Sequence, residues 1–108
     1  MPHKCIIAMV KPNLTDDVVR SAKKAGATGA TIIPASGTGA GEAKTFFGLS
    51  LDIRTELVLF LVNESIVDTI LTAIREAGRF SDPGTGIAMV LTVEQTAGME
   101  SQQSRNRR

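Results

Sequence analysis

Two halves of the sequence carry the same pattern of apolar and polar residues, offset by 52 positions. In each half, an apolar run is followed by a helical pattern, a glycine and a second apolar run. The offset places Val10 on Val62 and Ala25-Gly26 on Ala77-Gly78. Internal repetition of this kind indicates a duplicated supersecondary unit. In a chain of 108 residues it predicts a single ferredoxin-like α+β domain over residues 1–98: a duplicated βαβ unit forming a four-stranded antiparallel sheet, with two helices on one face.

Six segments are expected to form this fold. Apolar runs bounded by turn signals predict strands over residues 4–10, 29–36, 55–62 and 86–93. Apolar residues at helical spacing predict one helix within residues 14–25 and another over residues 64–77, with Gly26 and Gly78 directly after them. Pro34 lacks a backbone N–H donor, so the strand over residues 29–36 is expected at a sheet edge or with a bulge.

Three of the expected strands are apolar at every position over residues 5–10, 57–62 and 87–91. A strand with one solvated face alternates apolar and polar residues, whereas a continuous apolar run indicates burial on both faces. Two helices cover only one face of the sheet, and a soluble monomer does not tolerate so large an exposed apolar face. The sequence therefore predicts an obligate homo-oligomer, most simply a closed ring in which the sheets face inward.

Composition and charge narrow the classes of function. A formal net charge of +1 does not suggest a nucleic-acid binder, and no apolar run approaches the ~18 residues of a membrane helix, so no membrane insertion is expected. The single cysteine, Cys5, cannot form an internal disulfide, which favours a cytoplasmic location. His3 and Cys5 have no partners at catalytic or metal-binding spacing. We therefore expect no enzyme activity, no catalytic residues and no metal site.

Three segments outside the regular elements have two interpretations each. Gly37-Thr38-Gly39 opens a long loop over residues 37–54, either as an anion cradle or as a flexible hinge. The segment over residues 82–86 is either a simple turn or a second glycine-rich anion contact. Phe46 and Phe47 either anchor a partner protein, or they fold back onto the core or complete the loop as a β-hairpin. The polar tail over residues 99–108 is expected to be disordered.

Several short motifs, in their order and spacing, resemble the PII signal-transduction (nitrogen regulatory P-II) family, of which this chain looks like a divergent PII-like member. The similarity covers residues 4–98. Its specific pieces are Lys11-Pro12, Asp16-Asp17-Val18, Gly26-Ala27-Thr28-Gly29-Ala30-Thr31, Gly37-Thr38-Gly39, Ile66-Val67-Asp68-Thr69, Gly84-Thr85-Gly86 and Val93-Glu94. The resemblance implies a homotrimer with three clefts between subunits that bind an adenine nucleotide.

The resemblance also assigns roles to individual residues. Gly37, Thr38 and Gly39 would line the nucleotide cleft, and Thr31 would reach the adenine from the neighbouring subunit. From a B-loop over residues 79–86, Gly84, Thr85 and Gly86 would lie beneath the phosphates. The long loop corresponds to the family's T-loop, which docks on a target transporter, enzyme or regulator. Its expected partner contacts are Lys44, Phe46, Phe47 and Arg54.

The identity of the effector stays open at this point. The family's typical B-loop lysine corresponds to Ile87 in this chain, which removes a cation from the phosphate site. ADP, AMP, ATP, a cyclic nucleotide or a small anion such as bicarbonate are all candidate effectors, and none is expected to be obligatory. The alternatives from other classes are a ligand-free trimeric adaptor, a trimer like those of the divalent-cation-tolerance family, and a small ferredoxin-like enzyme.

Overall fold

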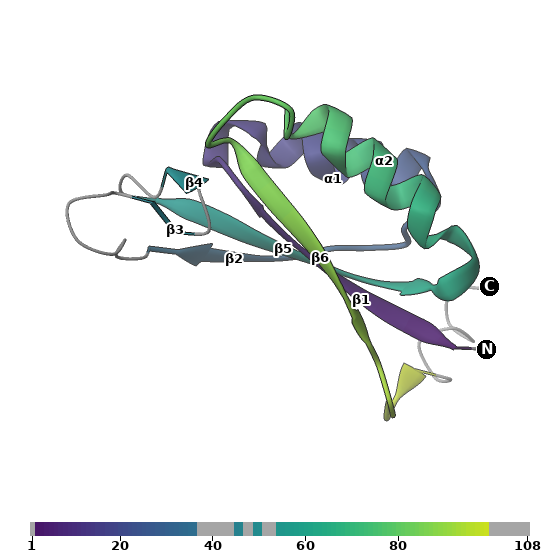
Figure 1. The fold of residues 1–108 in the computed structure, drawn as a ribbon. Helices are drawn as coiled ribbons and strands as arrows, with labels where there is room; N and C mark the ends of the chain where they lie inside the picture. The colour runs from purple at the N-terminus through teal and green to yellow at the C-terminus, as the bar shows by residue number, and fades with distance from the viewer. Residues whose placement is uncertain (1, 37–44, 47–48, 51–53, 100–108) are drawn as a thin grey trace.

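Four strands and two helices form the main body of the protein (Figure 1). The computed structural model describes residues 2–36, 45–46, 49–50 and 54–99. The main elements, in chain order, are β1 (His3–Val10), α1 (Thr15–Lys24), β2 (Thr31–Ala35), β5 (Thr55–Asn63), α2 (Val67–Ala77) and β6 (Gly86–Thr92). A short 3-10 turn precedes each helix, at Pro12–Leu14 and at Glu64–Ile66. The predicted α+β fold with antiparallel strands is confirmed.

The sheet has the strand order β2-β5-β1-β6, and every neighbouring pair is antiparallel. Each half of the duplicated chain contributes one central strand and one edge strand, which explains why neighbours in the sheet are not neighbours in the sequence. Strand β2 is an edge strand, as Pro34 predicted, and at an edge a missing N–H donor does not break a central ladder.

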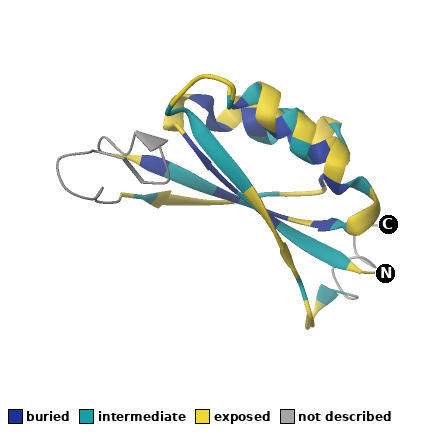
Figure 2. Cartoon of the chain, viewed as in Figure 1, coloured by how far each residue is buried: buried dark blue, intermediate teal, exposed yellow. Residues whose placement is uncertain are grey.

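Both helices pack on the same face of the sheet, as Figure 1 shows. Their apolar sides meet the central strands in a core of side chains that are at most 1% exposed: Ile6, Ala8, Val10, Val18, Ala22, Val58, Phe60, Ile70 and Ile74. Figure 2 shows buried stretches on both the helices and the central strands. Fully burying a side chain such as Ile, Val or Phe contributes roughly 1.5–3 kcal/mol, so this contact between layers stabilises the single chain.

The second face of the sheet is apolar as well. Residues directly opposite one another in antiparallel strands lie on the same face, so the register identifies the side chains on the helix-free face. In the middle of the sheet they are Thr31 and Ile33 in β2, Leu57, Leu59 and Leu61 in β5, Cys5, Ile7 and Met9 in β1, and Ile87, Met89 and Leu91 in β6. Towards the ends of the strands the same face carries Ala35, Thr55, His3 and Asn63. Leu61 and Leu91 are 45% and 44% exposed in the single chain. Both faces are therefore apolar, as predicted, but the helices cover only one of them.

A polar contact fixes the point at which the chain returns to the sheet after the long loop. Thr15, the first residue of α1 and only 3% exposed, donates its hydroxyl hydrogen bond to the Glu56 carboxylate. The neighbouring Thr55 hydroxyl donates to the Val10 carbonyl at 3.0 Å. The start of β5 is thus tied both to the helix layer and to the adjacent strand.

Part of the long loop forms a small hairpin. Strands β3 (Thr45–Phe46) and β4 (Leu49–Ser50) pair antiparallel, with Phe46 opposite Leu49. Of the two interpretations of this segment, the backbone supports the β-hairpin.

The two helices end in different ways. Gly26 follows α1 with a φ of 124°, a conformation that favours glycine, as predicted. Gly78 follows α2, but its φ of −84° is ordinary, and the left-handed residue is Arg79, with a φ of 57°. The Phe80 N–H returns to the Arg75 carbonyl at 3.0 Å, which closes the helix end. Gly78 is required for another reason, because a Cβ there would lie 2.9 Å from Cδ1 of Phe80.

These two neighbouring positions should therefore respond to substitution in opposite directions. Arg79→Gly removes a side chain from a left-handed conformation, so we expect the free energy of unfolding to rise by about 0.5–1 kcal/mol. Gly78→Ala forces the added methyl group against the Phe80 ring and should lower it. Urea denaturation of both variants measures the difference. A stabilised Gly78→Ala or a destabilised Arg79→Gly would contradict the assignment of this helix end.

Candidate functional site

The predicted B-loop residues form a compact turn between α2 and β6. Gly84 adopts a φ of 76°. The Thr85 hydroxyl lies within hydrogen-bond distance of two main-chain carbonyls of the same turn, those of Arg79 and Asp82, the latter at 2.9 Å. The Asp82 N–H donates to the Arg79 carbonyl at 3.0 Å. The donor of Thr85 is therefore used within the turn, and a ligand would meet its oxygen as an acceptor only.

Gly86 has a packing reason to be glycine. A Cβ at this position would lie 2.6 Å from the Met9 carbonyl oxygen and would also collide with the Phe80 ring. The same ring contacts the space above Gly78, so Phe80 lies over both glycines and holds the turn against the end of α2. The close packing of β1, β6 and Phe80 explains this glycine without a ligand.

Thr31 lies away from the turn within a single chain. It begins β2 on the helix-free face, is exposed, and pairs with Leu59 in β5. Gly86 begins β6 at the other edge of the sheet and pairs with Val10. Three strand-to-strand steps of about 4.8 Å separate the two edge strands, which amounts to roughly 14 Å across the sheet. One chain therefore does not bring Thr31 and the turn into contact with the same small ligand.

The other predicted residues lie in or beside the long loop. Gly37, Thr38, Gly39, Lys44 and Phe47 lie outside the described residues, as does the tail from residue 100. Phe46 is in β3, and Arg54 is an exposed residue directly before β5. The structure consequently leaves the predicted T-loop contacts as predictions.

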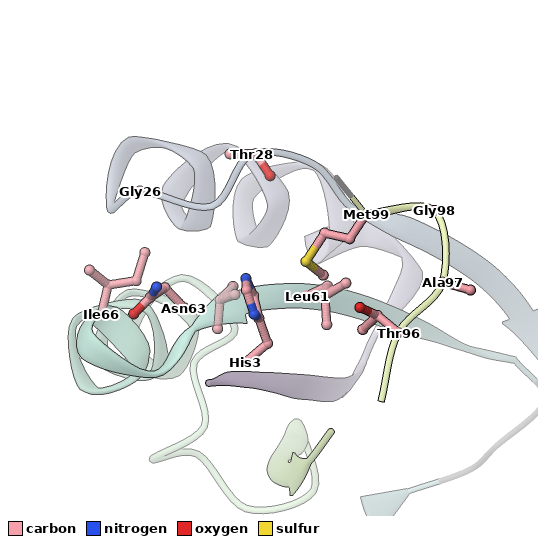
Figure 3. Close-up of a pocket in the computed structure, with 11 residues that line it drawn as sticks. His3, Gly26, Thr28, Leu61, Asn63, Ile66, Thr96, Ala97, Gly98 and Met99 are labelled. Carbon is pink, nitrogen blue, oxygen red and sulfur yellow. The ribbon is translucent and has the colours of Figure 1, made fainter. Parts of the chain in front are cut away.

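A cavity of ≈ 680 Å³ lies at the end of the sheet opposite the glycine turn (Figure 3). It is placed there by the register, because His3 and Asn63 pair at the end of β1 that is farthest from Val10 and Gly86. Its lining residues come from four separate segments of the chain: His3, Gly26, Thr28, Leu61, Val62, Asn63, Ile66, Thr96, Ala97, Gly98 and Met99.

The lining of this cavity combines apolar surface with the polar side chains of His3, Thr28, Asn63 and Thr96. Figure 3 shows His3 and Asn63 next to each other on one side, with the Met99 thioether above Leu61 on the other. The Asn63 side-chain oxygen accepts a hydrogen bond from the Ser65 N–H at 2.9 Å, which leaves its amide hydrogens for other partners. Such a cavity suits a planar or partly apolar molecule with a few hydrogen-bonding groups. No short motif in the sequence marks it, because its residues meet only in the folded chain.

Metal clusters and membrane-spanning helices are two further features by which a site is recognised. Among the described residues, no three His, Cys, Asp or Glu side chains gather closely enough to hold a metal ion. None of the helices in the described ranges is both long and apolar enough to cross a membrane.

Comparison with known proteins identifies the family. The family model of the nitrogen regulatory protein P-II matches residues 3–103, nearly the whole chain. A search of curated proteins gives no match. The four antiparallel strands and two helices of the main body are consistent with the fold of this family. The chain belongs to the P-II family, which confirms the resemblance seen in the sequence and supports a regulatory role in signal transduction rather than catalysis.

The hydrogen bonds of Thr85 lead to a test of the turn. Thr85→Val removes the hydroxyl and leaves the Arg79 and Asp82 carbonyls without this donor, so the free energy of unfolding should fall by about 1 kcal/mol. Thr85→Ser keeps the hydroxyl and serves as the control, with a smaller expected loss. Chemical denaturation compares the two variants, and an equal loss in both would show that the hydroxyl does not hold the turn.

Proposed function

We propose that the protein is a trimeric PII-like regulator. In this proposal a small effector, such as an adenine nucleotide or a small anion, binds in clefts between subunits. The bound effector selects one conformation of the loop over residues 37–54, and that loop controls a partner transporter, enzyme or regulator. A ligand shifts such an equilibrium only as far as its affinity differs between the loop conformations.

The observation that carries this proposal is the apolar, helix-free face of the sheet. Its exposed members on three strands include Ile33, Leu61, Met89 and Leu91, each between 37% and 45% exposed in the single chain. No Asp, Glu, Lys or Arg occupies the register positions of this face. Other copies of the same chain present the same apolar surface, so a closed ring of copies would cover all of them at once.

The location of the predicted site residues also favours clefts between copies. Thr31 and the glycine turn occupy opposite edges of one sheet and are too far apart to bind one small ligand together. In a ring, the β2 edge of one sheet would lie beside the β6 edge of the neighbouring sheet. Thr31 of one copy would then approach residues 84–86 of the next, and the loop over residues 37–54, opening with Gly37, would border the same cleft.

Main-chain N–H groups are the expected anion contacts in this cleft. Glycines allow a backbone to approach an anion without a clashing Cβ, and Gly84 already has the positive φ typical of such turns. The anchored start of β5, held by the bond between Thr15 and Glu56, gives the loop a fixed second end. Lys44, Phe46, Phe47 and Arg54 are proposed as partner contacts on the loop, and Gly37, Gly39 and Gly48 as its hinges.

A ligand-free trimeric adaptor is the second candidate, and one observation favours it. The Thr85 hydroxyl donates its hydrogen bond within the turn. The close packing of Met9 and Phe80 explains why residue 86 is a glycine. The turn therefore has a structural basis that does not need an effector. A trimer like those of the divalent-cation-tolerance family would share the fold, but the family match is to P-II.

Thermal unfolding with a panel of effectors separates the sensor from the adaptor. The panel is AMP, ADP, ATP, cyclic AMP, bicarbonate and 2-oxoglutarate, each titrated against the wild-type protein. A sensor should give a saturable rise in Tm with at least one of them, because a ligand at 100 times its Kd adds about 2.7 kcal/mol of stability. A flat response to every compound would contradict the sensor and favour the adaptor.

A pair of variants tests whether the cleft depends on assembly. Leu91 is 44% exposed in the single chain, so Leu91→Glu should leave the fold intact but place a charge in the proposed interface. We expect this variant to lose both the trimer and the effector response. Thr69→Glu adds the same charge at an exposed position on α2 and should keep both. If Leu91→Glu remains a trimer that responds to effector, the helix-free face is not the interface.

A further inference from the structure

The cavity bordered by His3, Asn63 and the segment Thr96–Met99 is a candidate binding site that the proposed function does not use. Its volume of ≈ 680 Å³ lies within the roughly 300–1,000 Å³ typical of small-molecule pockets. Figure 3 shows Met99 of this segment above Leu61 of β5. All of the described lining residues belong to one chain, so the walls of the cavity do not require a neighbouring copy.

The polar side of the cavity offers hydrogen-bond donors. The Asn63 side-chain oxygen already accepts from the Ser65 N–H at 2.9 Å, so the groups that Asn63 still has available are its two amide hydrogens. Figure 3 shows the His3 imidazole beside this amide. A neutral imidazole donates from one nitrogen and a protonated one from both. Together these side chains suit a ligand group that is rich in hydrogen-bond acceptors.

The charges around the cavity favour an anionic acceptor group. No Asp, Glu, Lys or Arg occurs among the described lining residues. Lys4 is directed to β6, where its Nζ donates to the Thr92 hydroxyl at 3.2 Å, and Glu64 and Glu94 are exposed residues outside the lining, where solvent screens their charges. Helix α2 begins at this end of the sheet, and the positive end of its dipole favours a negative group.

The rest of the wall is mainly apolar. Leu61, Ile66 and Met99 contribute side chains to it, and Leu61 is 45% exposed in the single chain. The unbranched thioether of methionine adapts to ligand surfaces of different shape. Contact with an apolar ligand body would remove part of this surface from water, which favours binding.

We propose that this cavity binds a small monocarboxylic acid with an aromatic or branched apolar body. The carboxylate accepts hydrogen bonds from the Asn63 amide and the His3 imidazole, and the body lies against Leu61 and Met99. This site is independent of the proposed function, because it needs neither the glycine turn nor a cleft between copies.

NMR titration of the ¹⁵N-labelled wild-type protein, in its assembled state, tests the site and the ligand class without any variant. The probes are 4-methylbenzoate and its neutral amide, 4-methylbenzamide. We expect saturable shifts of the Gly26, Thr28 and Gly98 amide signals with the acid, and an affinity about fivefold or more weaker for the amide. Equal affinities would overturn the carboxylate class. Shifts centred on residues 84–86, or none up to about 10 mM acid, would overturn the site, and closure of the cavity by a neighbouring copy would give the second of these results.

Asn63→Asp tests the donor itself. The substitution replaces the amide hydrogens with a carboxylate but keeps an oxygen that accepts from the Ser65 N–H, so the fold should persist. We expect the affinity for 4-methylbenzoate to fall about tenfold or more, because two carboxylates would face each other. Ser65→Asp adds the same charge at an exposed residue outside the lining and should change the affinity less than about threefold. Thermal unfolding checks that both variants are folded. Wild-type affinity in Asn63→Asp, or equal losses in the two variants, would show that Asn63 does not hold the carboxylate.

Discussion

The apolar, helix-free face of the sheet is the constraint on which the proposed assembly depends. The duplicated chain supplies two helices, which is enough to cover one face of a four-stranded sheet and no more. The uncovered face carries leucine, isoleucine and methionine on successive strands, including Leu61, Met89 and Leu91. Burying several such side chains, at roughly 1.5–3 kcal/mol each, competes with the 4–15 kcal/mol that association is estimated to cost. The proposed assembly of copies would cover this face, and the proposed clefts follow from that assembly.

The two ends of the sheet have different chemistry. At one end, the glycine turn, the start of β5 and the base of the long loop come together, and the bond between Thr15 and Glu56 joins them to the helix layer. At the other end, His3 and Asn63 border a cavity that has no Asp, Glu, Lys or Arg among its described lining residues. The proposed effector site belongs to the first of these ends, and the cavity to the second.

The fold was largely predictable because its signals are local. Apolar runs marked the four strands, Pro34 marked an edge strand, and continuous runs marked a sheet with two apolar faces. The residue that reverses the chain after α2 was not predictable, since the left-handed position is occupied by Arg79 while the neighbouring Gly78 serves to accommodate the Phe80 ring. The hydrogen bonds of the Thr85 hydroxyl depend on one side-chain rotamer, and the cavity near Asn63 depends on contacts between distant segments. No sequence pattern indicates either of them.

The mass of the wild-type protein in dilute solution tests the central claim most directly. Sedimentation at low micromolar concentration, without added ligand, should give a single folded species of about 34 kDa, three times the chain mass of 11.4 kDa. Folding can be followed in the same samples by circular dichroism. A well-folded species with the mass of one chain would mean that the fold is stable with the helix-free face exposed to solvent. That result would contradict both the ring and the clefts between its subunits.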